Sequence, residues 1–114
     1  MVIPSTQAVL EKYADRKQIL LVGAETHICV FQTFMDLKER NYDVYLVTDA
    51  ITSIRSWERK VAFRRMEKEG AILTTFENSV FDLLKDSKDE NFKKILGIIK
   101  ESKREKAISH LWYE

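Results

Sequence analysis

The stretch QILLVGAETHICV, residues 18–30, decides the fold of this 114-residue chain. Its first five residues, Gln18 to Val22, are almost wholly apolar, which is typical of a parallel strand covered on both faces. Gly23 ends the strand, and a helix is predicted from Cys29 to Arg40. The wide apolar surface of that helix must pack against a sheet. The only cysteine of the chain thus lies where a strand passes into a helix.

The same alternation of strand and helix continues along the chain. Such an order predicts parallel βαβ units with right-handed crossovers. The predicted fold class is therefore α/β, a three-layer α-β-α Rossmann-like parallel sheet of about three strands with flanking helices. Asn41 and Gly70 suit helix ends, and Ser5 and Ser56 suit helix starts. Further strands are predicted at 42–47 and 71–75, and further helices at 5–13, 56–69, 78–84 and 89–100.

Three loops are expected beyond the carboxyl ends of the strands, at 23–28, 48–55 and 75–78. Ligands of open parallel sheets bind at that edge. Backbone amides and the dipole at a helix N-terminus favour a thiolate over a thiol, so Cys29 is placed to act as a nucleophile. The structural alternative for a single cysteine is a small buried hydrophobic residue.

Composition excludes several classes of function. The net charge is +1, from 19 basic and 18 acidic side chains, which gives no electrostatic case for nucleic acid or an anionic membrane as partner. One cysteine excludes an internal disulfide and a cysteine-cluster metal site, and no metal or cofactor is expected. No stretch approaches the roughly 20 apolar residues of a membrane span, and the start lacks the pattern of a signal peptide. The expected location is cytoplasmic.

Residues 21–30, LVGAETHICV, resemble the nucleophile motif of the isochorismatase-like cysteine hydrolases. They are particularly similar to the eukaryotic isochorismatase domain-containing proteins. Two later segments resemble the same family, VYLVTDAITSIRS at 44–56 and AILTTFE at 71–77. The resemblance covers roughly residues 2 to 95 in three separated segments.

The resemblance implies hydrolysis of a small-molecule amide, ester or vinyl ether with Cys29 as the nucleophile. It also implies a cis peptide bond between Ala24 and Glu25. In the family this loop, here Ala24, Glu25 and Thr26, belongs to an oxyanion hole, and the matching donors are the amides of Glu25 and Cys29. Such donors stabilise the negative charge of a tetrahedral intermediate.

The family's catalytic aspartate and lysine have no counterpart here. Asp15 and Lys12 have the right chemistry but lie at the amino end of the following strand, so neither is assigned a role. Residues 1–100 therefore resemble the C-terminal part of the domain, followed by a charged tail at 101–114. Without a neighbour from the other half, the strand Gln18 to Val22 becomes an edge.

This expectation leaves other functions open. One is a homo-oligomer, or pairing with another chain, that completes the sheet. An inactive fragment that acts by protein–protein interaction with full-length or related protomers is the main alternative to the hydrolase. A third option is a redox-sensing thiol at Cys29, which needs no further catalytic residues.

Other polar and aromatic residues are first interpreted as structural. His27 is expected to pack or touch a substrate rather than act as a base, His110 has no visible partner, and Asp49 is expected to cap a loop. The spacing of Trp57, Phe63 and Met66 predicts a buried helix face. A solvated face is expected for the basic residues Arg55, Arg59, Lys60, Arg64 and Arg65, which alternate with glutamates.

Overall fold

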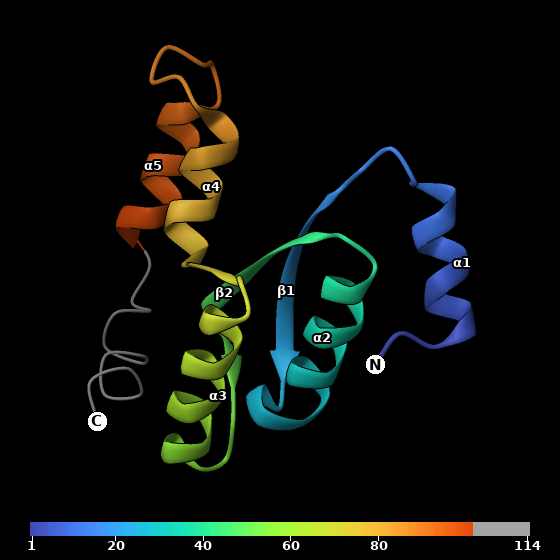
Figure 1. Ribbon diagram of the computed structural model, residues 1–114. Helices are drawn as coiled ribbons and strands as arrows, with labels where there is room; N and C mark the ends of the chain where they lie inside the picture. Colours follow the sequence, from blue (N-terminus) through green and yellow to red (C-terminus); the bar gives the residue numbers. More distant parts are fainter. Residues whose placement is uncertain (102–114) are drawn as a thin grey trace.

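A computed structural model describes residues 1–101 of the chain (Figure 1). Three parallel strands form one sheet in the order β1-β2-β3, which confirms the predicted α/β fold class. The charged tail beyond Glu101, with His110, lies outside the described residues. The elements are α1 (Pro4–Lys12), β1 (Gln18–Ala24), the π-helical turn η1 (Thr26–Val30), α2 (Phe31–Glu39), β2 (Asp43–Thr52), α3 (Ser56–Lys68), β3 (Ile72–Thr74), α4 (Phe76–Leu84) and α5 (Phe92–Glu101).

The hydrophobic core lies between β2 and the helices α2 and α3, which lie side by side against the sheet (Figure 1). Phe34 of α2, Leu46 of β2 and Met66 of α3 are completely buried there. Removing these apolar side chains from water is the main stabilising term of such a core. Phe63 is also buried, as predicted, whereas Trp57 is 59% exposed and its predicted place in the core is wrong.

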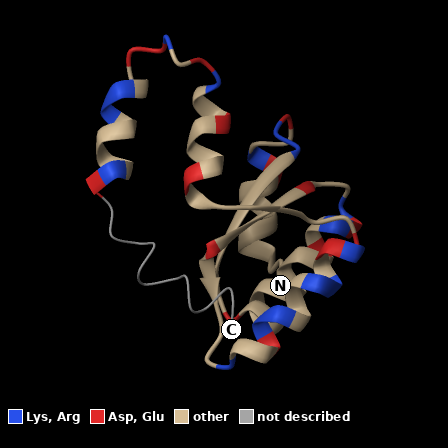
Figure 2. Cartoon of the chain, turned by 90° about the vertical axis from the view of Figure 1, so that its left-hand side faces the viewer, with Lys and Arg blue, Asp and Glu red and all other residues tan. Residues whose placement is uncertain are grey.

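The other face of the sheet is more open. Leu20, Tyr45 and Ile72 are neighbours in register across the three strands, and Leu20 and Ile72 are 47% and 43% exposed. Helices α4 and α5 form a pair that stands out from the rest of the chain (Figure 2), joined by the rings of Phe81 and Phe92 with centroids 5.2 Å apart. The described residues therefore cover one face of the sheet well and leave the other partly uncovered.

The structure corrects several predicted boundaries. Residues 48–52, predicted as a loop, continue strand β2, and Ile51 and Thr52 pair with Gly23 and Ala24 after a register shift. The hydroxyl of Thr48 also donates to the carbonyl of Thr74 at 2.8 Å, which ties this extension to β3. Short polar side chains such as threonine and aspartate suggested a loop, but tertiary pairing keeps the segment extended.

The helix boundaries differ by a few residues. Ile3 and Arg55 occupy the N-cap positions predicted for Ser5 and Ser56, and neither makes a side-chain cap. Helix α4 begins at Phe76 instead of residue 78, because the Thr75 side chain accepts a hydrogen bond from the Asn78 amide. Helix α5 begins at Phe92 instead of residue 89.

The two predicted helix ends are confirmed. Asn41 and Gly70 follow α2 and α3 with positive φ angles of 66° and 99°. This left-handed region terminates helices and favours glycine or asparagine.

Two predictions concern strand β1, and one of them is wrong. Its apolar pattern is typical of a strand covered on both faces, yet none of its residues is buried, and Val22 is 56% exposed. Among the described residues it pairs with β2 alone, so the edge position expected for this strand is confirmed there. Within residues 1–101, no helix is both long and apolar enough to cross a membrane.

Candidate active site around Cys29

Cys29 lies in η1, directly beyond the carboxyl end of β1, and its side chain is exposed. The predicted helix therefore does not begin at Cys29, because the π-helical turn Thr26–Val30 precedes α2. The carbonyl oxygen of Glu25 accepts hydrogen bonds from the amides of Ile28 and Val30, both at 3.1 Å. The two neighbours of the cysteine are thus held by one backbone oxygen.

The chain reverses sharply before this turn. Gly23 has a φ of 130°, which a residue with a Cβ rarely adopts. The peptide bond between Ala24 and Glu25, which the family resemblance implies to be cis, is cis in the structure. Strand β1 ends at Ala24, Glu25 is the N-cap of η1, and Thr26 is the first residue of the turn that carries the thiol.

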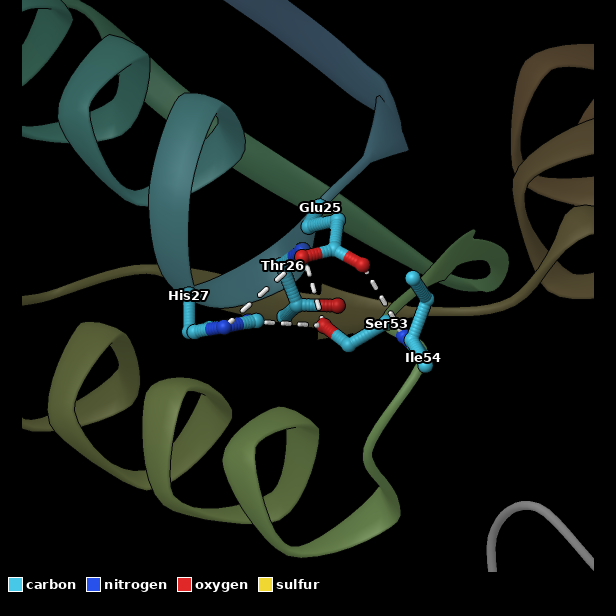
Figure 3. Close-up of polar contacts among 5 residues, drawn as sticks. All are labelled: Glu25, Thr26, His27, Ser53 and Ile54. Atoms are coloured by element: carbon cyan, nitrogen blue, oxygen red, sulfur yellow. Dashed lines mark hydrogen bonds and ion pairs between the residues drawn. The ribbon is translucent and has the colours of Figure 1, made fainter.

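A second loop, which joins β2 to α3, holds the cysteine turn in place (Figure 3). The Thr26 amide donates to Ser53 Oγ at 3.0 Å, and His27 Nδ1 lies 3.1 Å from the same oxygen. In return, the Ile54 amide donates to Glu25 Oε1 at 3.1 Å. His27 Nε2 lies 3.8 Å from Glu25 Oε2. Both loops lie at the edge of the sheet that the sequence predicts for them, whereas no sequence pattern indicates the role of Ser53.

Arg59 supports the second loop from inside the protein. Its side chain is only 3% exposed, and its guanidinium donates to the carbonyls of Ile51, at 3.0 Å, and Thr48. Burial lowers the pKa of Arg59 below its ordinary value, and the charge of Asp49 opposes that shift. The predicted solvated face is therefore wrong for Arg59, which stabilises the end of β2.

Asp49 of β2 contacts the start of α4, the helix that follows β3. Its Oδ1 accepts a hydrogen bond from the amide of Phe76, the first residue of α4, at 2.8 Å. A carboxylate at a helix N-terminus satisfies an otherwise unpaired amide and interacts favourably with the helix dipole. The structural interpretation of Asp49 is thus consistent with its position.

The remaining predicted residues have distinct environments. Thr26 is completely buried, and its Oγ1 makes no hydrogen bond within the described residues. The polar contacts of His27 are with Ser53 and Glu25, so its ring is oriented by the two loops. Among residues 1–101, no group of three or more His, Cys, Asp and Glu side chains is arranged to hold a metal ion.

Comparisons with known proteins agree with this architecture. The secreted isochorismatase effector Isc1 of Phytophthora sojae is 40% identical over 102 residues, which cover 89% of this chain and 49% of that protein. The structure of MAR1 ribonuclease from Caenorhabditis elegans is 41% identical with a TM-score of 0.79, covering 90% of this chain and 52% of that one. The YcaC gene product of Escherichia coli, described as an octameric hydrolase of unknown specificity, is 28% identical with a TM-score of 0.70, covering 76% and 43%.

The chain spans about half the length, or less, of the curated relatives it matches, which include isochorismatase domain-containing proteins of vertebrates. Residues 4–78 also match the model of the isochorismatase domain. That segment contains β1, the cysteine turn, β2, the Ser53 loop and β3. This chain belongs to the isochorismatase domain family.

Proposed function

We propose that the chain is a cysteine hydrolase of the isochorismatase family and that Cys29 is its nucleophile. The substrate is a small-molecule amide, ester or vinyl ether. The observation that carries this proposal is an exposed thiol on a turn whose backbone is fixed by Glu25 and Ser53. A nucleophile needs both access to substrate and a defined orientation.

For an amide or ester, the reaction takes two steps. The Cys29 thiolate attacks the carbonyl carbon, forms a C–S bond and expels the leaving group, which takes up a proton. Water then hydrolyses the thioester, releasing the acid and regenerating the thiol. In each step the amides of Glu25 and Cys29 stabilise the oxyanion. The Thr26 amide already donates to Ser53, so it is not assigned to the oxyanion.

The proposal requires a proton acceptor for the thiol. The resemblance implies an aspartate with a lysine in that role, and the sequence has no counterpart of either. Complete turnover therefore depends on a group supplied by another segment or another chain. The first half-reaction, by contrast, can be followed through Cys29 itself.

The test is the alkylation rate of Cys29 with iodoacetamide against pH, native and in denaturant, with Cys29→Ser as the blank. We expect native alkylation near pH 6 to exceed that of the unfolded chain by on the order of tenfold, which is what the proposal of an activated nucleophile requires. A substrate screen would follow that result. Equal native and unfolded rates at every pH would exclude an activated nucleophile.

A second candidate function is protein–protein interaction through β1, with or without catalysis. The seven residues of this edge strand carry no charge, and Leu20 and Val22 are about half exposed. The Lys17 carbonyl accepts the Asp43 amide of β2 at 2.8 Å. Because backbone polar groups alternate along a strand, those of Leu20 and Val22 face away from β2 and are available to another strand.

A second copy of the chain fits this edge in an antiparallel arrangement. A two-fold axis at Leu21 pairs Leu20 with Val22 of the other copy, through the backbone groups that face outward. It also brings Lys17 of each copy opposite Glu25 of the other, so opposite charges flank the apolar contact. The octameric state of YcaC is consistent with association in this family.

Sedimentation velocity tests the pairing. We expect a dimer that Val22→Lys disrupts, because a charge on an edge strand opposes pairing. In a Cys29→Ser background, Leu21→Cys should form a disulfide across the axis under mild oxidation. A chain that stays monomeric at high concentration would argue against this candidate.

The cytoplasmic location stays a prediction for both candidate functions.

A further inference from the structure

We propose that Ser53 is a positioning residue for Cys29: it fixes the orientation of the cysteine turn and thereby sets the reactivity of the thiol. This inference rests on the proposed function of Cys29 as nucleophile. Ser53 is 24 positions away in the sequence. Its hydroxyl accepts the amide of Thr26 (Figure 3), and the backbone carbonyl of the adjacent Glu25 accepts the amides on either side of Cys29.

The first part of the argument is that Ser53 has a fixed position. It directly follows β2 and is 8% exposed, and Ile51, two residues before it, is 2% exposed. The carbonyl of Ile51 accepts the Nε–H of the buried Arg59 at 3.0 Å. Ser53 is therefore held by the core of the domain, unlike Ile54 beside it, which is 91% exposed.

The second part is that one hydroxyl serves two residues of the cysteine turn. The Thr26 amide can only donate, so Ser53 Oγ accepts there at 3.0 Å. The hydroxyl proton is then available for Nδ1 of His27, 3.1 Å away. When the hydroxyl donates to Nδ1, the ring proton of His27 is on Nε2, on the side of Glu25 Oε2 at 3.8 Å. The one hydroxyl of Ser53 can thus hydrogen-bond to both the Thr26 amide and the His27 ring.

The third part is how the contact reaches the thiol. The side chain of Glu25 accepts the amide of Ile54, which follows Ser53, at 3.1 Å. The backbone carbonyl of the same Glu25 accepts the amides of Ile28 and Val30, on either side of Cys29. Movement of Glu25 or Thr26 therefore changes the backbone that carries the thiol. A misplacement of about 1 Å is enough to cost a catalytic group much of its rate.

The test compares three serine variants in the alkylation assay, with melting temperature measured in parallel. Ser53→Ala removes the hydroxyl, and Ser53→Thr keeps it. Ser79→Ala is the matched control, because Ser79 is 9% exposed and its hydroxyl donates to the Thr75 carbonyl at 2.7 Å, away from the cysteine turn.

We expect Ser53→Ala to lose on the order of tenfold in native alkylation rate and to acquire a pH profile close to that of the unfolded chain. Ser53→Thr should recover most of the rate. Ser79→Ala should keep the wild-type profile even if its melting temperature falls as far. A purely structural role for Ser53 predicts the same profile for both alanine variants.

A folded Ser53→Ala protein with the wild-type profile would overturn the inference and leave the proposed function intact. Equal native and unfolded rates in the wild type would overturn both. If Ser53→Ala does not fold, His27→Ala decides instead, because it removes the second hydrogen-bond partner of the hydroxyl and keeps the Thr26 bond. A lower rate in His27→Ala supports the inference, and an unchanged rate contradicts it.

Discussion

Strands β1 and β2 are parallel neighbours of similar apolar composition, yet they have opposite environments. In β2, Val44, Leu46 and Val47 are at most 5% exposed, whereas β1 has no buried residue. The difference comes from their neighbours, because β2 lies between two strands and β1 pairs with one among the described residues. An apolar strand sequence thus indicates that burial of the strand would be favourable. Whether the strand is buried depends on the neighbouring strands and helices.

The segments that follow these two strands make different contributions to the candidate site. The turn that follows β1 carries the exposed thiol, and the loop that follows β2 supplies Ser53 and Ile54, which hold that turn. Arg59 anchors the β2 loop to the core. The reactive group therefore lies after the exposed strand, and its support comes from the buried one. A rigid support is what a positioned nucleophile requires.

The largest expected effect comes from a matched pair of leucines on the two strands. Leu46→Ala should lower the free energy of unfolding by about 2–5 kcal/mol, because it empties a completely buried site. Leu20→Ala, at a position 47% exposed, should cost less than about 1 kcal/mol. Urea denaturation followed by circular dichroism measures both. Similar losses at the two positions would mean that the side chain of Leu20 is covered in solution.

The second expected effect concerns the buried arginine behind β2. Arg59→Met should cost about 2–4 kcal/mol, because it leaves the carbonyls of Ile51 and Thr48 without their donor. Arg64→Met, at an exposed position on the same helix, should stay within about 0.5 kcal/mol of the wild type. Thermal melts at one pH compare the two variants. Equal stability of both would show that the Arg59 contacts contribute little net stability.

Much of the fold could be predicted from local patterns. The strand starting at Gln18, the helix ends at Asn41 and Gly70, and the gathering of three loops at one edge all follow from apolar periodicity and turn chemistry. The exposure of β1 could not follow from its own residues, because cover depends on a neighbouring strand. The extension of β2 through Thr52 likewise depends on pairing with β1.

The candidate site was predicted less completely. Cys29 stands out by its position after a strand, but Ser53 acts through a hydrogen bond to a residue 27 positions away, and no local spacing encodes such a contact. The burial of Arg59, by contrast, is indicated by the sequence. Together with Ala62, Phe63 and Met66, this residue follows the i, i+3, i+4, i+7 spacing of a buried helix face. The surrounding charges obscured that signal.

The smallest expected effect lies where β2 meets α4. Asp49→Ala should cost about 1 kcal/mol, because the Phe76 amide loses its acceptor and the N-terminus of α4 loses a negative charge. Asp43→Ala, at the exposed start of the same strand, is the matched control and should be nearly neutral. Hydrogen exchange of the α4 amides separates a local effect from a global one. Faster exchange confined to α4 would show that the end of β2 supports this helix as well as the cysteine turn, whereas uniform acceleration would place the role of Asp49 in the core.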